Sequence, residues 1–152
     1  MTEPMSDRAP SFDLRSRASF QHWVTHTLRY NDQDPIGHVN NSVFSTFLEQ
    51  GRTAFLHPIV KSAAHPGLDI VLARVVIDFL KELHFPGHVE IGSRIVRLGT
   101  KSFVVANGVF DGASETCAAT GEATLVFFDT NARRAVLPPP SVRAEFERLL
   151  GG

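Results

Sequence analysis

Four strand-like segments follow one another in the second half of the chain, and they constrain the fold more than any other feature. They are rich in Val, Ile, Leu and Phe and cover residues 70–83, 88–98, 103–110 and 117–129. The connectors between them are short and contain glycine, proline and other turn formers. Because short connectors favour antiparallel hairpins, we expect these segments to form an antiparallel sheet of consecutive hairpins.

One long helical pattern precedes these segments. Asn40 or Asn41 can cap its start, because a short side-chain oxygen accepts hydrogen bonds from the first free amides of a helix. Apolar residues then recur three and four positions apart: Phe44, Phe47, Leu48, Phe55 and Leu56. Gly51 lies on the same stripe, where it weakens the helix, so we expect it to allow close approach to a sheet. The helix ends, or begins its last irregular turn, at His57-Pro58.

The remaining segments complete the predicted fold. Residues 20–30 alternate as a strand does, and after three prolines a short amphipathic helix is expected over 142–150, with Ser141 as its cap. The order of elements predicts an α+β fold with about five antiparallel strands. The chain has 152 residues, about the size of one domain. We expect a flexible arm over 1–19 and a single domain over 20–152.

Composition excludes several classes of protein. With 15 basic and 16 acidic side chains, the chain lacks the broad basic face of a nucleic-acid-binding or membrane-surface protein. No run approaches the roughly 18 apolar residues of a transmembrane helix. The single cysteine, Cys117, excludes internal disulfides, and together with the absence of a secretory signal it predicts a cytoplasmic protein. His84 and His88 flank a Pro-Gly turn without a third ligand, so we expect no metal site.

Residues 30–41, with the sequence YNDQDPIGHVNN, contain most of the informative polar side chains. They join the end of a strand to the start of a helix, where free backbone amides can bind an anion or the oxyanion of a reaction intermediate. Asp34 precedes these amides and could attack a carbonyl group or activate water. A structural interpretation stays open, because a D-x-D-P-x-G sequence is also a common turn in which Asp32 and Asp34 only cap the backbone.

This segment resembles the hotdog-fold acyl-CoA thioesterases, in particular the family related to 4-hydroxybenzoyl-CoA thioesterase. The matching residues are Tyr30, Asp32, Asp34, Gly37, His38-Val39-Asn40-Asn41, Glu49 and Arg52. The order of elements over residues 20–129 also fits the hotdog fold, in which an antiparallel sheet wraps around a long helix. The resemblance implies hydrolysis of an acyl-CoA thioester to a free acid and CoA.

The resemblance also implies catalytic and binding roles for individual residues. Asp34 corresponds to the catalytic aspartate, which acts as nucleophile or general base. Asn41, with Asn40 beside it, corresponds to the first helical turn, whose amide polarises the thioester carbonyl. Gly37 corresponds to the glycine that lets the loop turn into the helix. His38 corresponds to a variable position that shapes the pocket and is not the base.

Further substrate contacts and the assembly follow from the same resemblance. Lys101, Ser102 and Phe103 lie where the family contacts CoA, although a solvated hairpin turn is the competing interpretation. Glu49 is a rival catalytic carboxylate, since some hotdog branches use a helix glutamate; otherwise it pairs with Arg52. No cofactor is implied, because CoA is part of the substrate. In the family the pantetheine arm threads between subunits, so we expect a homodimer or homotetramer.

Two alternative functions stay open. Enoyl-CoA hydratases of the same fold carry a D-x-N-P-x-H pattern with the histidine five positions after the aspartate. Here His38 lies four positions after Asp34 and six after Asp32, so the pattern fits poorly. A non-catalytic acyl-CoA-binding module would show stabilisation by the ligand without turnover. The acyl group, and the choice between CoA and carrier-protein thioesters, depend on a pocket shape that the sequence does not give.

Overall fold

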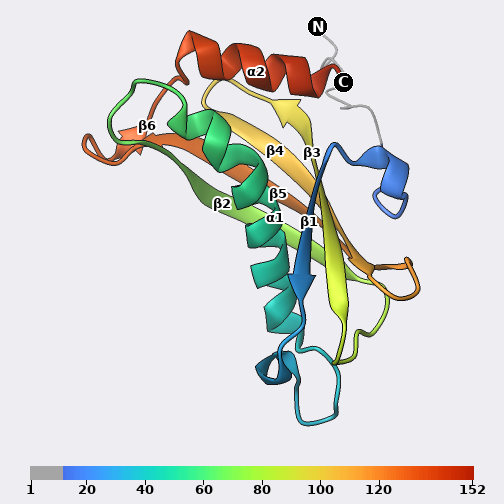
Figure 1. Ribbon diagram of the computed structural model, residues 1–152. Coiled ribbons are helices and arrows are strands. Elements are labelled where there is room, and N and C mark those ends of the chain that lie inside the picture. Colours follow the sequence, from blue (N-terminus) through green and yellow to red (C-terminus); the bar gives the residue numbers. More distant parts are fainter. Residues whose placement is uncertain (1–11) are drawn as a thin grey trace, which may run out of the picture.

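The computed structural model describes residues 12–152 and confirms the α+β class (Figure 1). The strands are β1 (His22–Thr27), β2 (Leu68–Phe79), β3 (His88–Leu98), β4 (Ser102–Asp111), β5 (Cys117–Asp129) and the short β6 (Arg134–Ala135). The α-helices are α1 (Asn41–Lys61) and α2 (Pro140–Leu150), and two single 3-10 turns are η1 (Arg17–Ser19) and η2 (Tyr30–Asp32). No helix among these residues is long and apolar enough to cross a membrane.

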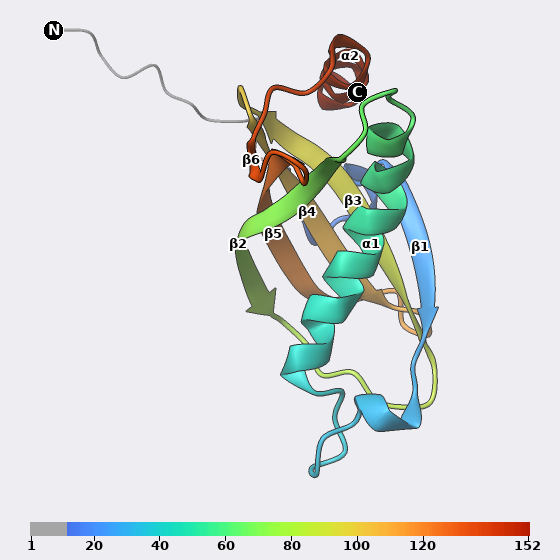
Figure 2. The same cartoon turned by 90° about the vertical axis from the view of Figure 1, so that its left-hand side faces the viewer.

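All strands belong to one antiparallel sheet with the order β1-β3-β4-β5-β2, and β6 pairs with β5. The sheet curls around α1, which lies along its concave side between the two edge strands (Figure 2). This is the arrangement of the hotdog fold that the sequence predicts. Two hairpins, β3–β4 and β4–β5, also lie where the short connectors predict them.

The predicted hairpin between the first two strand-like segments, 70–83 and 88–98, is wrong. β2 pairs with β5 at one edge of the sheet, while β3 lies between β1 and β4. β2 ends at Phe79, so its connector is eight residues long and can extend about 26 Å. The three strand spacings from β2 to β3 need only about 14 Å. The connector therefore crosses the sheet's end beside the start of α1, and this crossing forms one wall of the site described below.

Helix α1 follows the sequence prediction closely. Asn40 is its N-cap, and the side-chain oxygen accepts a hydrogen bond from the Ser42 N–H. Gly51 faces the sheet, and a side chain there would come within 2.5 Å of Ile91, so glycine permits the expected close approach. Pro58 lies inside the helix, which continues to Lys61, and the Pro58 carbonyl accepts from the Ser62 N–H. The proline thus begins the last turn rather than ending the helix.

Two apolar clusters fill the space between helices and sheet. The α2-side cluster is built around the rings of Phe103, Phe127 and Phe146, whose centroids lie 4.8–5.2 Å apart. The pocket-side cluster is built around Phe44, Phe47 and residues of β3 and the β2–β3 connector. Helix α2 begins earlier than predicted, at Pro140, and Ser141 is not its cap. Proline at the first helical position supplies a suitable φ angle and lacks an N–H that would need a partner.

The predicted arm falls partly outside the described residues, which begin at 12. Its last residues lie against the domain. Arg17 of η1 pairs with Glu90 of β3 at 2.5 Å and stacks over the Trp23 ring at 4.3 Å. The Phe12 ring lies under the Arg94 guanidinium. Aromatic and basic side chains of residues 12–19 therefore contact β1 and β3, and the flexibility of the arm stays a prediction.

Candidate active site

A tight loop before α1 carries the candidate catalytic residue. Asp34-Pro35-Ile36-Gly37 forms a β-turn closed by a hydrogen bond of 3.0 Å from the Gly37 N–H to the Asp34 carbonyl. Proline suits the second position of such a turn, and Gly37 has a φ of +84°, which favours glycine. The Asp34 N–H donates to the His38 carbonyl at 2.8 Å, which closes the loop. Gly37 thus has the backbone geometry of a turn glycine, and its contact with a substrate stays a prediction.

The first acid of the D-x-D sequence, Asp32, anchors this loop and does not face the site. Its side chain is fully buried and accepts hydrogen bonds from the backbone and side chain of Arg29, at 2.7–3.1 Å. The Asp32 carbonyl accepts the Asn40 N–H at 2.8 Å. Asp32 thereby ties the strand end to the start of α1. The structural interpretation of the turn applies to this residue.

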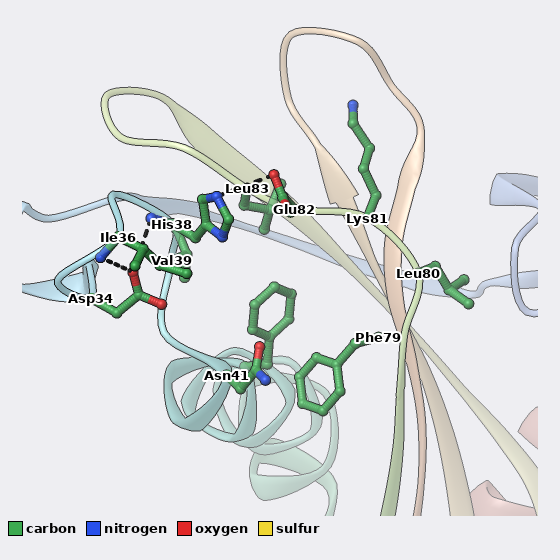
Figure 3. Close-up of a pocket in the computed structure, with 11 residues that line it drawn as sticks. Asp34, Ile36, His38, Val39, Asn41, Phe79, Leu80, Lys81, Glu82 and Leu83 are labelled. Atoms are coloured by element: carbon green, nitrogen blue, oxygen red, sulfur yellow. Dashed lines mark hydrogen bonds and ion pairs between the residues drawn. The ribbon is translucent and has the colours of Figure 1, made fainter.

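The second acid, Asp34, is held in a different way. Its Oδ1 accepts the backbone N–H groups of Ile36 and His38, at 3.0 and 3.1 Å. None of the hydrogen bonds within residues 12–152 uses its Oδ2, and the side chain is half-buried. Figure 3 shows this carboxylate beside the start of α1, with Asn41 on the neighbouring turn. One oxygen thus fixes the orientation of the group, and the other is available to a ligand.

The start of α1 offers one free backbone donor next to this carboxylate. The backbone N–H of Asn40 is engaged by Asp32, and its side-chain oxygen caps the helix. Asn41 is the first helical residue and is exposed. Its N–H has no acceptor within the described part of the chain, since helical hydrogen bonds run back four residues. Of the two predicted asparagines, Asn41 therefore presents an amide that a ligand oxygen can use.

These groups line a pocket of about 320 Å³. Its walls come from the loop, the first turn of α1 and the connector after β2, and its lining residues are Asp34, Ile36, His38, Val39, Asn41, Phe44, Phe79, Leu80, Lys81, Glu82 and Leu83. In Figure 3 Phe79 lies opposite the polar side of the pocket. The Lys81 ammonium is bound to Asp111, Ser114 and Thr116 on the β4–β5 turn. The pocket thus combines the Asp34 carboxylate and the free Asn41 amide with an apolar wall.

The connector adds two polar residues at the pocket rim that the sequence analysis did not place there. Glu82 Oε2 lies 3.2 Å from His38 Nε2 and 3.6 Å from His84 Nε2. The sequence pairs His84 with His88 by spacing, whereas His88 packs on Gly112 of the β4–β5 turn. No local signal could have found this group, because His38 is separated from the other two by more than forty residues of chain.

The predicted CoA contacts on the β3–β4 turn lie at the other end of the sheet (Figure 1). Lys101 is exposed, Ser102 is half-buried, and Phe103 is enclosed in the α2-side cluster with 1% of its surface exposed. Within one chain the structure does not bring them to the Asp34 pocket. Their proposed contact with a substrate stays a prediction.

The rival carboxylate, Glu49, lies on the outer face of α1. It is exposed and lies 3.8 Å from Arg52, as the structural interpretation predicts. Burial lowers the pKa of Arg52, and the Glu49 charge opposes that shift. Both line a separate hollow of about 170 Å³, together with Leu72 and Val75 of β2. Glu49 therefore does not share the Asp34 pocket within one chain.

Residues 28–146 match the sequence model of a family described as the thioesterase-like superfamily. Among solved structures, a thioesterase from Thermus thermophilus complexed with coenzyme A and Zn is 30% identical, with a TM-score of 0.74 over 86% of this chain and 94% of that chain. A protein from Pseudomonas aeruginosa strain PAO1 is 24% identical, with a TM-score of 0.78 and coverage of 88% and 94%. The DHNA-CoA thioesterase from Staphylococcus aureus is 13% identical, with a TM-score of 0.76 and coverage of 85% and 90%. No curated protein sequence matches the chain significantly.

Proposed function

Because the chain belongs to the thioesterase-like superfamily, we propose that it hydrolyses an acyl-CoA thioester to a free acid and CoA, at the pocket that contains Asp34. One observation supports this most directly. The Asp34 carboxylate has one oxygen held by two backbone amides and one oxygen free, beside the unpaired N–H of Asn41. A nucleophile or base next to an oxyanion donor is the arrangement that acyl transfer requires.

The reaction can follow either of two routes from this geometry. In the first, the free oxygen of Asp34 attacks the thioester carbonyl, the C–S bond breaks, and CoA leaves as the thiol after taking up a proton. Water then cleaves the resulting mixed anhydride and regenerates the carboxylate. In the second route, Asp34 takes a proton from water as the water attacks the carbonyl. The tetrahedral intermediate then collapses with cleavage of the C–S bond, and the proton passes from Asp34 to the departing CoA thiolate, which regenerates the carboxylate. In both routes the Asn41 N–H donates to the developing oxyanion at the positive end of α1.

The pocket walls provide for the rest of the substrate. The Phe44 and Phe79 side chains offer an apolar surface for the acyl group, and their rings lie 5.3 Å apart. Gly37 and His38 lie on the loop at the opposite, polar side, where we place the thioester and the start of the pantetheine arm. The Thermus relative carries coenzyme A in its structure, which supports a CoA ester as substrate here. The cytoplasmic location stays a prediction from the sequence.

We propose further that two copies of the chain pair through β2. This strand forms an edge of the sheet, and the side chains Val71, Leu72, Val75, Val76 and Phe79 are all exposed at 38–48%. An exposed apolar edge strand of this length readily pairs with another strand. Phe79 and Leu80 also line the Asp34 pocket, so a second copy would complete one wall of it.

Such a dimer would also give the β3–β4 turn a role. Two β2 strands paired antiparallel place the Ser102 end of one sheet near the Phe79 end of the other. The separation is about three strand spacings, or roughly 14 Å. Lys101 and Ser102 of one copy are then within reach of a CoA molecule bound at the other copy's pocket. The tetramer stays the alternative assembly.

The test is hydrolysis of a panel of acyl-CoA esters, from short aliphatic to long-chain and aromatic, followed by release of free thiol. We expect Asp34→Asn to lower kcat by about a hundredfold or more, because Asn cannot act as base or nucleophile. Glu49→Gln is the matched control, since it removes the rival carboxylate, which lies on α1. Activity that survives in Asp34→Asn and is lost in Glu49→Gln would overturn the assignment. Stabilisation by acyl-CoA without any turnover would instead indicate a binding module.

A further inference from the structure

Three potential metal ligands converge at the rim of the pocket, and the reaction proposed above uses none of them as acid, base or oxyanion donor. His38 comes from the loop before α1, and Glu82 and His84 come from the connector after β2. One ligand atom from each of the three residues lies within 4.8 Å of the ligand atoms of the other two, and Glu82 Oε2 faces the Nε2 atoms of both histidines. The two imidazole rings approach edge to face with centroids 5.1 Å apart. Their nitrogens therefore face the same carboxylate from two directions.

The hydrogen bonding of His84 fixes which of its nitrogens is available. Its Nδ1 lies 3.2 Å from the carbonyl oxygen of Gly37. A carbonyl can only accept, so Nδ1 carries the proton and Nε2 of the neutral ring has a free lone pair. In the neutral ring that lone pair lies 3.6 Å from Glu82 Oε2, so a cation between the two atoms could be bound by both. A backbone carbonyl that orients a histidine in this way is the usual support of a metal-ligating imidazole.

The distances between the ligand atoms suit zinc. For Zn–N and Zn–O bonds of about 2.0–2.1 Å, the ligands of a tetrahedral ion lie about 3.3 Å apart. The two separations from Glu82 Oε2 are 3.2 Å to His38 Nε2 and 3.6 Å to His84 Nε2. The side chains of Glu82 and His84 are 62% and 60% exposed, so small rotations can complete the geometry without disturbing the core. Two histidines and one carboxylate are also a donor set that zinc commonly takes.

We propose that His38, Glu82 and His84 bind one zinc ion at the pocket rim. Three protein ligands leave the fourth coordination position open to water or to an anionic oxygen of a bound ligand. The ion joins the Asp34 loop to the β2–β3 connector, the two segments that form the pocket's polar wall. Because the backbone N–H of His38 donates to Asp34, holding this histidine also holds the orientation of that carboxylate. The ion is therefore a positioning element for the loop, independent of which substrate the pocket accepts.

A second histidine–carboxylate pair provides a matched control. His57 Nε2 lies 3.2 Å from Asp69, the same separation as in the His38–Glu82 pair. There the third group is the ammonium of Lys61, which lies 3.1 Å from the other Asp69 oxygen. A cation already occupies that carboxylate, so zinc should not bind. Comparing the two sites therefore distinguishes a three-ligand zinc site from zinc binding to any histidine that lies next to a carboxylate.

The experiment uses the full chain without a polyhistidine tag, first stripped of metal with a chelator. Zinc binding is measured by competition with a chromophoric chelator, and Co²⁺ is then added as a spectroscopic probe. We expect one ion per chain and the visible absorption typical of four-coordinate Co²⁺. His84→Ala and Glu82→Gln should each weaken zinc binding by more than about tenfold. His57→Ala should bind as the wild type does.

Either of two results would overturn the proposal. One is equal zinc affinity in the wild type and in both rim variants, or loss of binding in His57→Ala. The other is the absence of zinc binding by the wild type, in which case a proton on His38 accounts for its contact with Glu82. Circular dichroism spectra of the variants show whether they are folded. No substrate is present in these measurements, so their outcome does not depend on whether the chain hydrolyses thioesters.

Discussion

The two ends of the sheet are built from different interactions. At the α2 end, three phenylalanine rings pack together behind α2. At the opposite end, backbone amides, buried Asp32 and the cap residue Asn40 hold a loop around an open pocket. Apolar packing contributes stability without directional demands, whereas hydrogen bonds place individual atoms. The comparison suggests that the first end supplies stability and the second supplies chemistry.

The largest expected effect on stability lies at the α2 end. Phe146 is fully buried and contacts the rings of Phe103 and Phe127. Phe146→Ala should lower the free energy of unfolding by about 3–5 kcal/mol, because it removes a buried ring and leaves a cavity. Urea unfolding measures this loss. Leu137→Ala, at a 60% exposed position beside the same helix, should change stability by less than about 0.5 kcal/mol. Similar losses in both variants would show that the buried phenylalanine rings are not the source of stability at the α2 end.

A smaller stability effect is expected from Asp32 at the pocket end. Asp32→Asn keeps the shape of the side chain but replaces one of its two acceptor oxygens with an amide N–H₂. That donor group would then lie against N–H donors of Arg29. We expect a loss of about 1–3 kcal/mol in the free energy of unfolding. Asp34→Asn should lose much less stability, since only one Asp34 oxygen accepts hydrogen bonds and an amide oxygen can replace it. Comparable losses from the two substitutions would show that Asp34 is also a structural residue.

Much of the fold could be predicted because its signals are local. The apolar stripe of α1, its cap at Asn40 and the bounds of β3 and β5 follow from side-chain periodicity and turn chemistry. The order of strands could not be predicted in the same way. β2 does not pair with β3, the next strand in the sequence, because the connector between them is long enough to cross the end of the sheet. No pattern in residues 80–87 predicts which strand the following segment pairs with.

The candidate site likewise has one part that local sequence signals predict and one part that they do not. Asp34, Gly37 and Asn41 lie within one short segment, so motif and turn chemistry could place them together. The separate tasks of Asp32 and Asp34 depend on which acid faces Arg29, and that is decided by the path of the loop. Glu82 and His84 reach the rim only through the crossing connector. Residues that meet through a connection between distant strands leave no pattern in a single sequence.

Removing the helix cap at Asn40 should have an intermediate effect on stability, and it tests whether the cap also positions the pocket. Asn40→Ala removes the oxygen that accepts the N–H and hydroxyl of Ser42. The free energy of unfolding should fall by about 0.5–2 kcal/mol. If the cap also positions the adjacent Asn41 amide, kcat for a good acyl-CoA ester should fall in Asn40→Ala, and Asn40→Asp should restore both properties. A cap variant with reduced stability and unchanged kcat would separate the cap from the oxyanion donor.

The smallest expected effect is a pH dependence of stability, which arises from a histidine near the α2 end. His22 stacks on Phe55 with ring centroids 5.1 Å apart, and its Nδ1 is buried without a partner within residues 12–152. Burial lowers the pKa of His22 below its ordinary value of 6.5. The unfolded chain therefore takes up a proton that the folded chain does not, so stability falls as the pH decreases below about 6.5. Above that pH the effect is absent, since His22 is neutral in both states.

His22→Gln should remove this part of the pH dependence. Urea unfolding of wild type and variant between about pH 7.5 and about pH 5.5 makes the comparison, because a histidine of the unfolded chain takes up its proton within this range. The wild type should lose more stability across the range than His22→Gln does. An equal slope in both proteins would show that the ring gains water or an acceptor in solution. The stack of His22 on Phe55 would then be hydrated, and the contrast between the apolar α2 end and the hydrogen-bonded pocket would be weaker than the contacts indicate.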